Sequence, residues 1–265
     1  MKTHPNCKIN LGLHVIERRP DGYHNLESIF LPVFDLCDDL EIIPLPDKPY
    51  GYCQFSQDGI PITCNTEDNL CVRAYKLLQQ QFPLKVGAVR IHLTKKIPFG
   101  AGLGGGSSDA TFVLRMLNEL YKLSLSDEQL CHYAIQLGAD CPFFVHNQAA
   151  YVTGIGDQQE LLNFSLEDAG LRLFIRKPDD SVSTREAYAG IKPRNIQPHI
   201  ATPNLKEALR QPVTEWRDLF VNDFEKTVFP NHPAIAQLKK QFYQEGAVYA
   251  SMTGSGAAVF GIFIK

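Results

Sequence analysis

Residues 98–111 read PFGAGLGGGSSDAT. Five glycines in seven positions, from Gly100 to Gly106, lead into two serines and then into a segment with helical spacing of its apolar residues. Glycine lets the backbone turn through positive φ and lets a ligand approach the main chain closely. The first N–H groups of a helix have no intrahelical acceptor, and the helix dipole favours an anion beside them. The stretch therefore predicts a phosphate-binding loop and, with it, a bound nucleotide.

Other glycine-rich loops fit this segment less well. Gly100, Gly102 and Gly105 match the dinucleotide spacing G-x-G-x-x-G, but that loop closes the first strand of a βαβ unit and precedes an acidic strand end. Here the acidic candidates, Glu119 and Asp127, lie in helical segments. A Walker A loop would need a lysine after its last glycine, and the protein-kinase motifs His-Arg-Asp and Asp-Phe-Gly do not occur. A flexible linker is the remaining alternative, but a proline and a helix frame the loop tightly.

Composition narrows the class of protein. The 265 residues suit one large domain or two smaller ones, and 44% of them are hydrophobic, enough for a core. The formal net charge is −3 with scattered Lys and Arg, so we expect no nucleic-acid partner. The sequence holds no apolar run of membrane-spanning length and no signal peptide, so no membrane is expected. Seven dispersed cysteines without a Cys-x-x-Cys pair favour reduced thiols and a cytoplasmic location.

The first 155 residues mix strand and helix patterns. Alternation over 7–16 predicts a strand with one buried side, which is followed by a turn at Pro20. A strand over 89–94 leads into the glycine loop. The other expected elements are strands at 26–36 and 39–44, a helix from Asn65 or Thr66 to about Phe82, a helix after the loop, and a helix from a capping box at Ser126 to Gly138. This order predicts a mixed sheet with helices on one face.

The pattern changes after about residue 155. A strand is expected at 171–176, and 183–245 is mainly helical with proline breaks. Two strands follow near 247–252 and 257–264, joined by a second glycine-serine turn. A sheet backed by helices fits this order, so we predict two domains, 1–155 for binding and catalysis and 156–265 as a second α+β domain.

Two charged residues are candidates for chemistry. Asp140 lies between a helix end and the apolar run 143–145, where a carboxylate is rarely left unpaired. The alternative is an aspartate that merely ends a helix. Lys8 stands on the polar face of an apolar strand, and the alternative is an ordinary solvated strand lysine. Phosphoryl transfer needs a cradled phosphate, a positioned nucleophile and neutralised charge, and Ser107 and Ser108 add hydroxyls for phosphate or Mg²⁺.

Five segments carry a family resemblance. PNCKINL at 5–11, the loop at 98–111 and TGSGAA at 253–258 resemble the GHMP kinase superfamily. PDGYHNLESIF at 20–30 and GADCPFF at 138–144 resemble its branch that acts on a CDP-linked polyol. The motifs follow the family order across nearly the whole chain. Cys7 and Thr111 depart from the pattern, which usually has alanine at both positions.

The resemblance implies a fold and a co-substrate. The fold is α+β with two domains, an N-terminal mixed sheet with helices (ribosomal protein S5 domain 2-like) and a C-terminal ferredoxin-like domain. The turn at 253–256 would close on the same site as the glycine loop. ATP is implied as co-substrate together with Mg²⁺, whose ligands are unknown. The residues implied to hold the triphosphate are Pro98, Phe99, Gly100, Ala101, Gly102, Leu103, Gly104, Gly105, Gly106, Ser107 and Ser108.

The resemblance also implies an ATP-dependent phosphotransferase with a small-molecule substrate, a CDP-linked methylerythritol. Lys8 and Asp140 match the family's catalytic pair. Asp140 would take the proton from the acceptor's 2-hydroxyl, and Lys8 would orient that hydroxyl.

The same branch implies how the substrate is bound. Tyr23 and Tyr188 would enclose the cytosine ring, His24 would bond its edge, and Asn10 would lie near the sugar-like moiety. Tyr188 rests on a looser match at 183–188, and its alternative is a core tyrosine. Two other functions stay open: a kinase for another alcohol, such as mevalonate or homoserine, and a non-catalytic nucleotide sensor. A monomer or a homodimer is expected.

Overall fold

The computed structural model describes residues 1–62, 64–194 and 204–265. They form two compact units, each assembled from segments that are separated in the sequence. The first unit comprises Met1–Cys7, Val33–Phe99 and Gly104–Asn147, and the second comprises Lys8–Pro32, Gly100–Leu103 and Gln148–Lys265. The glycine-rich loop therefore contributes residues to both units.

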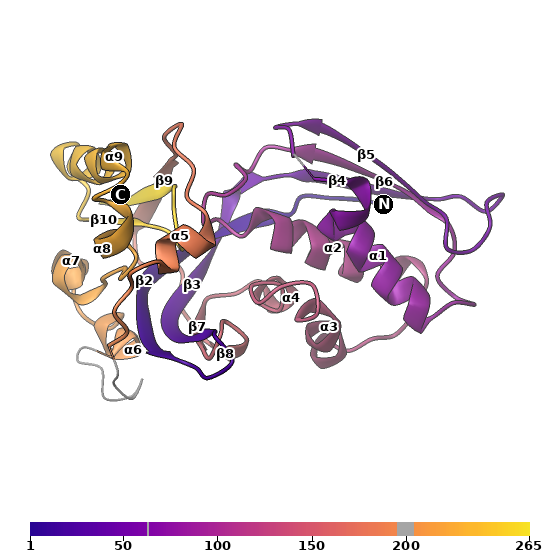
Figure 1. Ribbon diagram of the computed structural model, residues 1–265, viewed down its shortest axis with the longest axis horizontal. Helices are drawn as coiled ribbons and strands as arrows, with labels where there is room; N and C mark the ends of the chain where they lie inside the picture. The colour runs from indigo at the N-terminus through magenta and orange to yellow at the C-terminus, as the bar shows by residue number, and fades with distance from the viewer. Residues whose placement is uncertain (63, 195–203) are drawn as a thin grey trace. The chain divides into compact units, whose positions relative to one another are not determined.

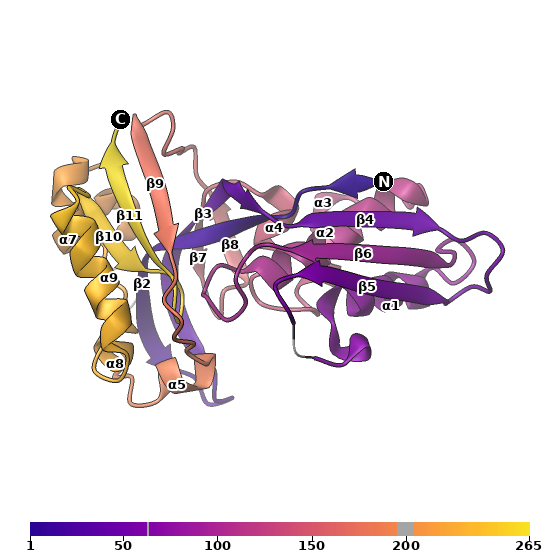
Figure 2. The ribbon, with the colours of Figure 1, turned by 90° about the horizontal axis from the view of Figure 1, so that it is seen from above.

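The first unit contains a mixed four-stranded sheet. Its strands are β1 (Lys2–Thr3), β4 (Asp39–Pro44), β6 (Val89–Lys95) and β5 (Cys53–Gly59), in the order β1-β4-β6-β5. The β5–β6 pair is parallel and the other pairs are antiparallel. Strand β6 lies between β4 and β5 (Figure 2), and its alternation places Val89, Ile91 and Leu93 in the core. A mixed sheet with helices is confirmed, but its composition differs from the prediction: β5 is an additional strand, and the strands expected at 7–16 and 26–36 belong to another sheet.

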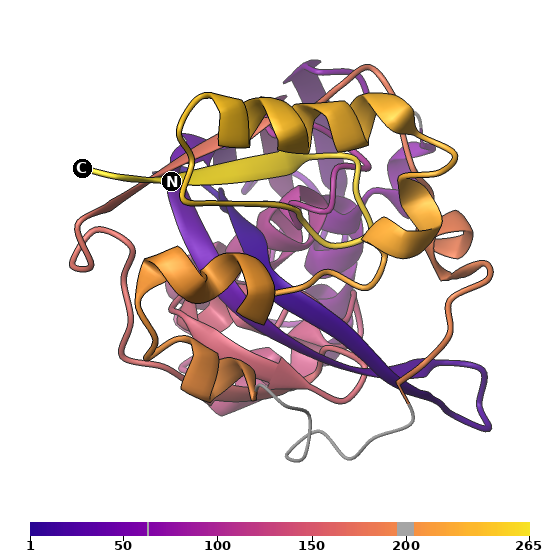
Figure 3. The ribbon, with the colours of Figure 1, turned by 90° about the vertical axis from the view of Figure 1, so that its left-hand side faces the viewer.

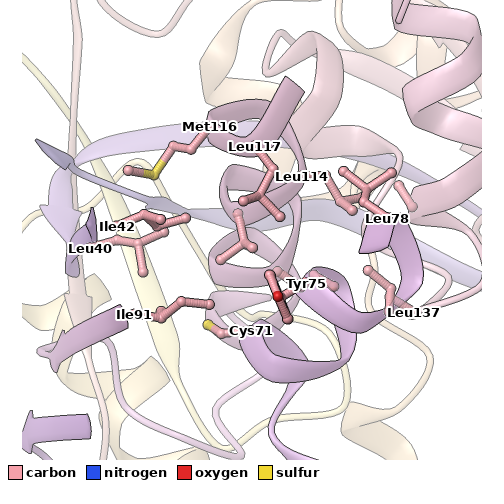
Figure 4. Close-up of a cluster of buried hydrophobic side chains, with 14 of the residues drawn as sticks. Leu40, Ile42, Cys71, Tyr75, Leu78, Ile91, Leu114, Met116, Leu117 and Leu137 are labelled. Atoms are coloured by element: carbon pink, nitrogen blue, oxygen red, sulfur yellow. The ribbon is translucent and has the colours of Figure 1, made fainter. Parts of the chain in front are cut away.

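Helices cover one face of this sheet (Figure 1). Next to the sheet lie α1 (Leu70–Gln81) and α2 (Gly105–Leu120), and α3 (Asp127–Ala134) and α4 (Phe143–His146) pack against these two helices. Leucine and isoleucine side chains from β4 and β6 meet the apolar faces of α1 and α2 in a common core (Figure 4). Buried members of this core include Leu40, Ile42, Ile91, Tyr75, Leu78, Leu114 and Leu117. The apolar stripe predicted for the helix after the loop is therefore the stripe that packs on the sheet.

Two helix ends differ from the prediction. Helix α1 begins at Leu70, because the Asn69 side chain accepts the N–H of Cys71 at 2.9 Å and the preceding residues form a short 3₁₀ turn, η1 (Thr66–Asp68). The capping box at Ser126 is confirmed, but α3 ends at Ala134 rather than at residue 138. Beyond Ala134 the Gln136 and Leu137 N–H groups donate to carbonyls three residues back, and these tighter turns end the regular helix.

The second unit carries two further sheets. One has the strand order β2-β3-β7-β8, and the other is antiparallel with the order β10-β11-β9. Their bounds are β2 (Asn6–Arg18), β3 (His24–Cys37), β7 (Ala150–Thr153), β8 (Gln158–Leu161), β9 (Leu171–Arg176), β10 (Tyr249–Met252) and β11 (Val259–Ile264). The three predicted C-terminal strands are confirmed. Strands β7 and β8 are additional.

Short helices and one longer helix complete the second unit. They are α5 (Thr184–Tyr188), α6 (Leu205–Ala208), η3 (Val213–Glu215), α7 (Trp216–Leu219), α8 (Glu225–Val228) and α9 (Pro233–Gln244). Helix α9 lies along β10 and β11 (Figure 3), so the predicted sheet backed by helices is confirmed. Residues 195–203 of the predicted helical segment lie outside the described residues. Within the described part of the chain, no helix combines the length and the apolarity needed to cross a bilayer.

Strand β2 corrects one prediction. We expected one buried side, but every residue from Asn6 to Ile16 is buried. A Cβ built on Gly12 would lie 3.0 Å from Leu205 and 3.1 Å from Phe220, so the α6–α7 segment covers the face that we expected to be solvated. Polar side chains on that face must therefore find partners inside the protein.

Candidate active site

The two glycine turns of the second unit pack directly on each other. The Ala258 N–H donates to the Ala101 carbonyl at 3.2 Å, and the Ala257 N–H approaches the Gly100 carbonyl at 3.4 Å. Gly102 has a φ of +72°, and a Cβ there would lie 2.0 Å from the Thr253 carbonyl oxygen. The segment 253–258 therefore contacts the glycine loop through main-chain atoms at residues 100–102.

We expect Gly102→Ala to lower the free energy of unfolding by about 3 kcal/mol, because the new methyl group overlaps the Thr253 carbonyl and the residue keeps a positive φ. Gly100→Ala is the matched control, since Gly100 has a φ of +62° but no atom within 4 Å of the built Cβ. That control is expected to cost about 1–2 kcal/mol. Urea denaturation of both variants measures the difference, and equal losses would contradict the close-approach argument.

Lys8 lies at the centre of this part of the site. Its side chain is 3% exposed, and Nζ donates to Asn10 Oδ1 at 2.6 Å and to the Gly102 carbonyl at 3.0 Å. The ammonium also lies 4.7 Å from the centroid of the Phe30 ring. This burial excludes the alternative of an ordinary solvated strand lysine. Burying an ammonium group costs free energy unless hydrogen bonds compensate it. For Lys8, Asn10 and the Gly102 carbonyl accept those bonds.

Two residues that the sequence analysis missed orient Asn10. Thr253 Oγ1 accepts the Asn10 backbone N–H at 3.1 Å and lies 3.3 Å from Asn10 Oδ1. Ser28 Oγ accepts from Asn10 Nδ2 at 3.0 Å and donates to the Gly12 carbonyl at 2.6 Å. These contacts fix which end of the Asn10 amide faces Lys8. In the sequence, Ser28 stands out only as a polar residue within the mainly apolar segment 26–31. Thr253 could have been found from its position in the second glycine motif.

Two of the three predicted aromatic residues are brought together. The His24 and Tyr188 rings stack with centroids 4.6 Å apart and an interplanar angle of 23°. Burial lowers the pKa of His24, which favours a neutral ring that can both donate and accept. Tyr23 is 63% exposed on the adjacent turn. Helix α5, which carries Tyr188, is tied to the start of α9 by His232, whose Nε2 lies 2.8 Å from Glu186.

In the first unit, the glycine loop ends at the start of α2. Gly104 caps the helix with a φ of +69°, and no acidic residue occupies the first turn. The N–H groups of that turn therefore keep their attraction for an anion. Within the described residues, the buried Ser108 hydroxyl has no hydrogen-bond partner. A buried hydroxyl without a protein partner is commonly explained by a bound ion or water molecule.

A buried charge cluster lies beneath the start of α2. Lys95 Nζ contacts Asp38 and lies 2.6 Å from Asp109 Oδ2, with all three side chains almost fully buried. Asp38 Oδ1 accepts the Lys96 and Ile97 N–H groups at 2.5 and 2.8 Å, whereas Asp109 Oδ1 has no partner in the described part of the chain. Burial raises the pKa of Asp109 to about 8, so we infer that Asp109, and not Asp38, is the protonated carboxyl group of this cluster.

Asp140 lies on a turn that packs against α2. The turn over 138–142 follows the loop after α3 and leads into α4, so Asp140 does not end a regular helix. Thr111 Oγ1 donates to the Cys141 carbonyl at 2.9 Å. This bond joins the turn that carries Asp140 to the helix that follows the glycine loop. The described residues hold no group of three His, Cys, Asp or Glu side chains placed to bind a metal ion.

Known proteins match almost the full length of the chain. A curated 4-diphosphocytidyl-2-C-methyl-D-erythritol kinase from Bacteroides thetaiotaomicron is 51% identical over 265 residues, covering 99% of this chain and 92% of the relative. One from Chlorobium chlorochromatii is 39% identical, covering 99% of this chain and 88% of the relative. The chain belongs to the 4-diphosphocytidyl-2-C-methyl-D-erythritol kinase family. The predicted superfamily is thereby confirmed.

Matches to family models and to solved structures support this family assignment. The model of the GHMP kinases N terminal domain matches residues 69–148, and that of the GHMP kinases C terminal matches 203–265. A crystal structure of a 4-(cytidine 5'-diphospho)-2C-methyl-D-erythritol kinase aligns with a TM-score of 0.78 at 32% identity, covering 98% of this chain and 89% of that one. The Methanococcus jannaschii mevalonate kinase aligns with a TM-score of 0.72 at 14% identity, covering 99% of this chain and 90% of that one. The last match shows a shared fold alone. The two-domain α+β fold of the GHMP kinases is confirmed.

Proposed function

We propose that this chain transfers the γ-phosphate of ATP to the 2-hydroxyl of 4-diphosphocytidyl-2-C-methyl-D-erythritol, in the non-mevalonate isoprenoid precursor pathway. The single observation that carries the proposal is 51% identity to a kinase of that name over 99% of this chain. The buried, hydrogen-bonded Lys8 and the glycine loop support it, because both features serve phosphoryl transfer.

The glycine loop is the proposed triphosphate site. Residues 98–108 would supply backbone N–H groups, and the first turn of α2 would add its dipole. The unpartnered Ser108 hydroxyl is a hard oxygen donor of the type that Mg²⁺ accepts, so the residues present fit this ion. Without a protein cage of carboxylates in the described part of the chain, Mg²⁺ would enter with the nucleotide and be held by its phosphates and Ser108. The ion would neutralise charge on the phosphates.

Lys8 and Asp140 are the proposed catalytic pair. Asp140 would accept the proton of the 2-hydroxyl as general base. Lys8 would orient that hydroxyl and neutralise charge. Asn10 holds the Lys8 ammonium in place by accepting a hydrogen bond from it. Asn10 would thereby act beside the sugar-like moiety.

The His24–Tyr188 stack is the proposed base-binding element. Flat aromatic rings can stack on a cytosine, and a neutral His24 can form a hydrogen bond to the edge of the base. The exposed Tyr23 ring would cover the base from the adjacent turn. The described residues contain no disulfide bond, which is in keeping with a cytoplasmic location, and a monomer or a homodimer remains our prediction for the assembly.

An ADP-release assay tests the proposal. Purified protein with ATP and Mg²⁺ is expected to release ADP when 4-diphosphocytidyl-2-C-methyl-D-erythritol is added and to remain at background with mevalonate or homoserine. The fold alone does not separate these substrates, since mevalonate and homoserine kinases share it at 14–17% identity. Turnover of another alcohol would replace the proposed substrate. Tight ATP binding without any turnover would favour a nucleotide sensor.

A further inference from the structure

Thr111 makes a contact that the family pattern does not predict. Its side chain is completely buried on α2, one turn after the loop serines. Its hydroxyl is shared between two acceptors, the Ser107 carbonyl at 2.9 Å and the Cys141 carbonyl at 2.9 Å. An alanine, which the family resemblance leads us to expect at this position, could make neither bond. The hydroxyl thus joins the first turn of α2 to the residue immediately after Asp140.

The surrounding atoms leave this turn little room to move. A Cβ built on Gly138 would lie 3.4 Å from Cys141 Sγ and 3.7 Å from Ser107 Oγ, so the turn over 138–142 lies close against the first turn of α2. Burial raises the pKa of the Cys141 thiol to about 11, which keeps it neutral in this contact. The Cys141 carbonyl also accepts the Phe144 N–H at 3.1 Å. Thr111 therefore supplies a second bond to an acceptor that shapes the start of α4.

We propose that Thr111 is a positioning residue for Asp140. Its hydroxyl holds the turn over 138–142 at a set place on α2, and the same helix presents Ser107 and Ser108 at the glycine loop. Helix α2 thereby sets the positions of both the Asp140 carboxylate and the phosphate-binding groups. Displacement of a catalytic group by about 1 Å can cost about 10²-fold in rate, so a side chain that touches no substrate can control turnover. The inference rests on the proposed function of Asp140.

The test separates the hydroxyl from the shape of the side chain. Thr111→Val keeps the branched shape and removes the donor, and Thr111→Ser keeps the donor and removes the methyl group. We expect Thr111→Val to lower kcat about ten-fold with the KM for ATP unchanged within about two-fold, and Thr111→Ser to retain kcat within about two-fold. Equal losses in both variants, or an unchanged kcat in Thr111→Val, would overturn the proposal. If Thr111→Val folds poorly, Thr111→Ala removes the same donor and is expected to show the same kcat loss.

A second readout does not depend on activity. Amide hydrogen exchange in Thr111→Val is expected to accelerate at Cys141, Phe143 and Phe144, whose N–H groups bond within the turn and α4, with α1 unchanged. In an Asp140→Asn background, Thr111→Val is expected to cause no further loss of kcat. An inactive wild-type protein would refute the proposed function. Unchanged exchange at the turn, in an active wild-type protein, would refute the positioning role alone.

Discussion

Asp140→Asn is expected to lower kcat by about 10²–10⁴-fold and to leave the protein folded. The amide has the same shape as the carboxylate but cannot accept the proton of the acceptor hydroxyl. Asp140 is half-buried on a turn and asparagine has the same size, so the substitution removes a base without opening a cavity in the core. Steady-state ADP release at saturating ATP and cytidyl substrate measures the loss, and a thermal melt checks the fold.

The control for this variant is an aspartate outside the proposed site. Asp47 is exposed on the turn after β4, and Asp47→Asn is expected to keep kcat within about two-fold. Near wild-type turnover in Asp140→Asn would remove Asp140 from the role of base. A rise in KM alone would instead assign Asp140 to binding.

Lys95→Met is expected to lower the free energy of unfolding by about 3–5 kcal/mol, because it leaves the buried Asp38 carboxylate without its cation and the buried Asp109 carboxyl group without its hydrogen-bond donor. Methionine fills a similar volume, so little of the loss comes from packing. Urea denaturation at neutral pH measures the change. The effect should reach the glycine loop, because a Cβ built on Gly105 would lie 3.0 Å from Lys95 Nζ.

Asp109→Asn is the matched variant within the same cluster. With a pKa raised to about 8, Asp109 is largely protonated at neutral pH, and the neutral amide is expected to cost about 1 kcal/mol or less. The folded protein binds this proton between pH 4 and 8 while the unfolded chain releases it, so this group makes the wild type less stable as pH rises through that window. The Asn variant should lack that slope. A loss as large as that of Lys95→Met would show that Asp109 is ionised.

Local sequence signals predicted much of this fold. Strands β4, β6 and β9 alternate or run apolar, and the capping box at Ser126 forms as its residues require. The glycine loop and α2 were predictable because closely spaced glycines followed by helical spacing of apolar residues favour a loop and then a helix. These elements were predictable because their side chains and their backbone favour the same local conformation. The family could be identified from five short motifs for the same reason.

Other elements depend on partners that are distant in the sequence. Strands β5 and β8 are polar and become strands because β6 and β7 offer them a ladder. Lys8 is buried where the Gly102 carbonyl and the Phe30 ring meet it from other parts of the chain. Asp38, Lys95 and Asp109 come from three segments that are distant in the sequence, and no local pattern signals such a cluster.

Residue types and their spacing were enough to predict the proposed chemistry: a side-chain-poor loop at a helix start, a lysine on a strand and an aspartate on a turn. The neighbours that orient those groups emerge from the packed chain, among them Thr253 and Ser28 around Asn10, and Thr111 beside the turn of Asp140. This difference arises because periodicity encodes which face of an element is buried. The partner of a buried hydroxyl or amide depends on which residues the packed chain brings within about 3 Å of it.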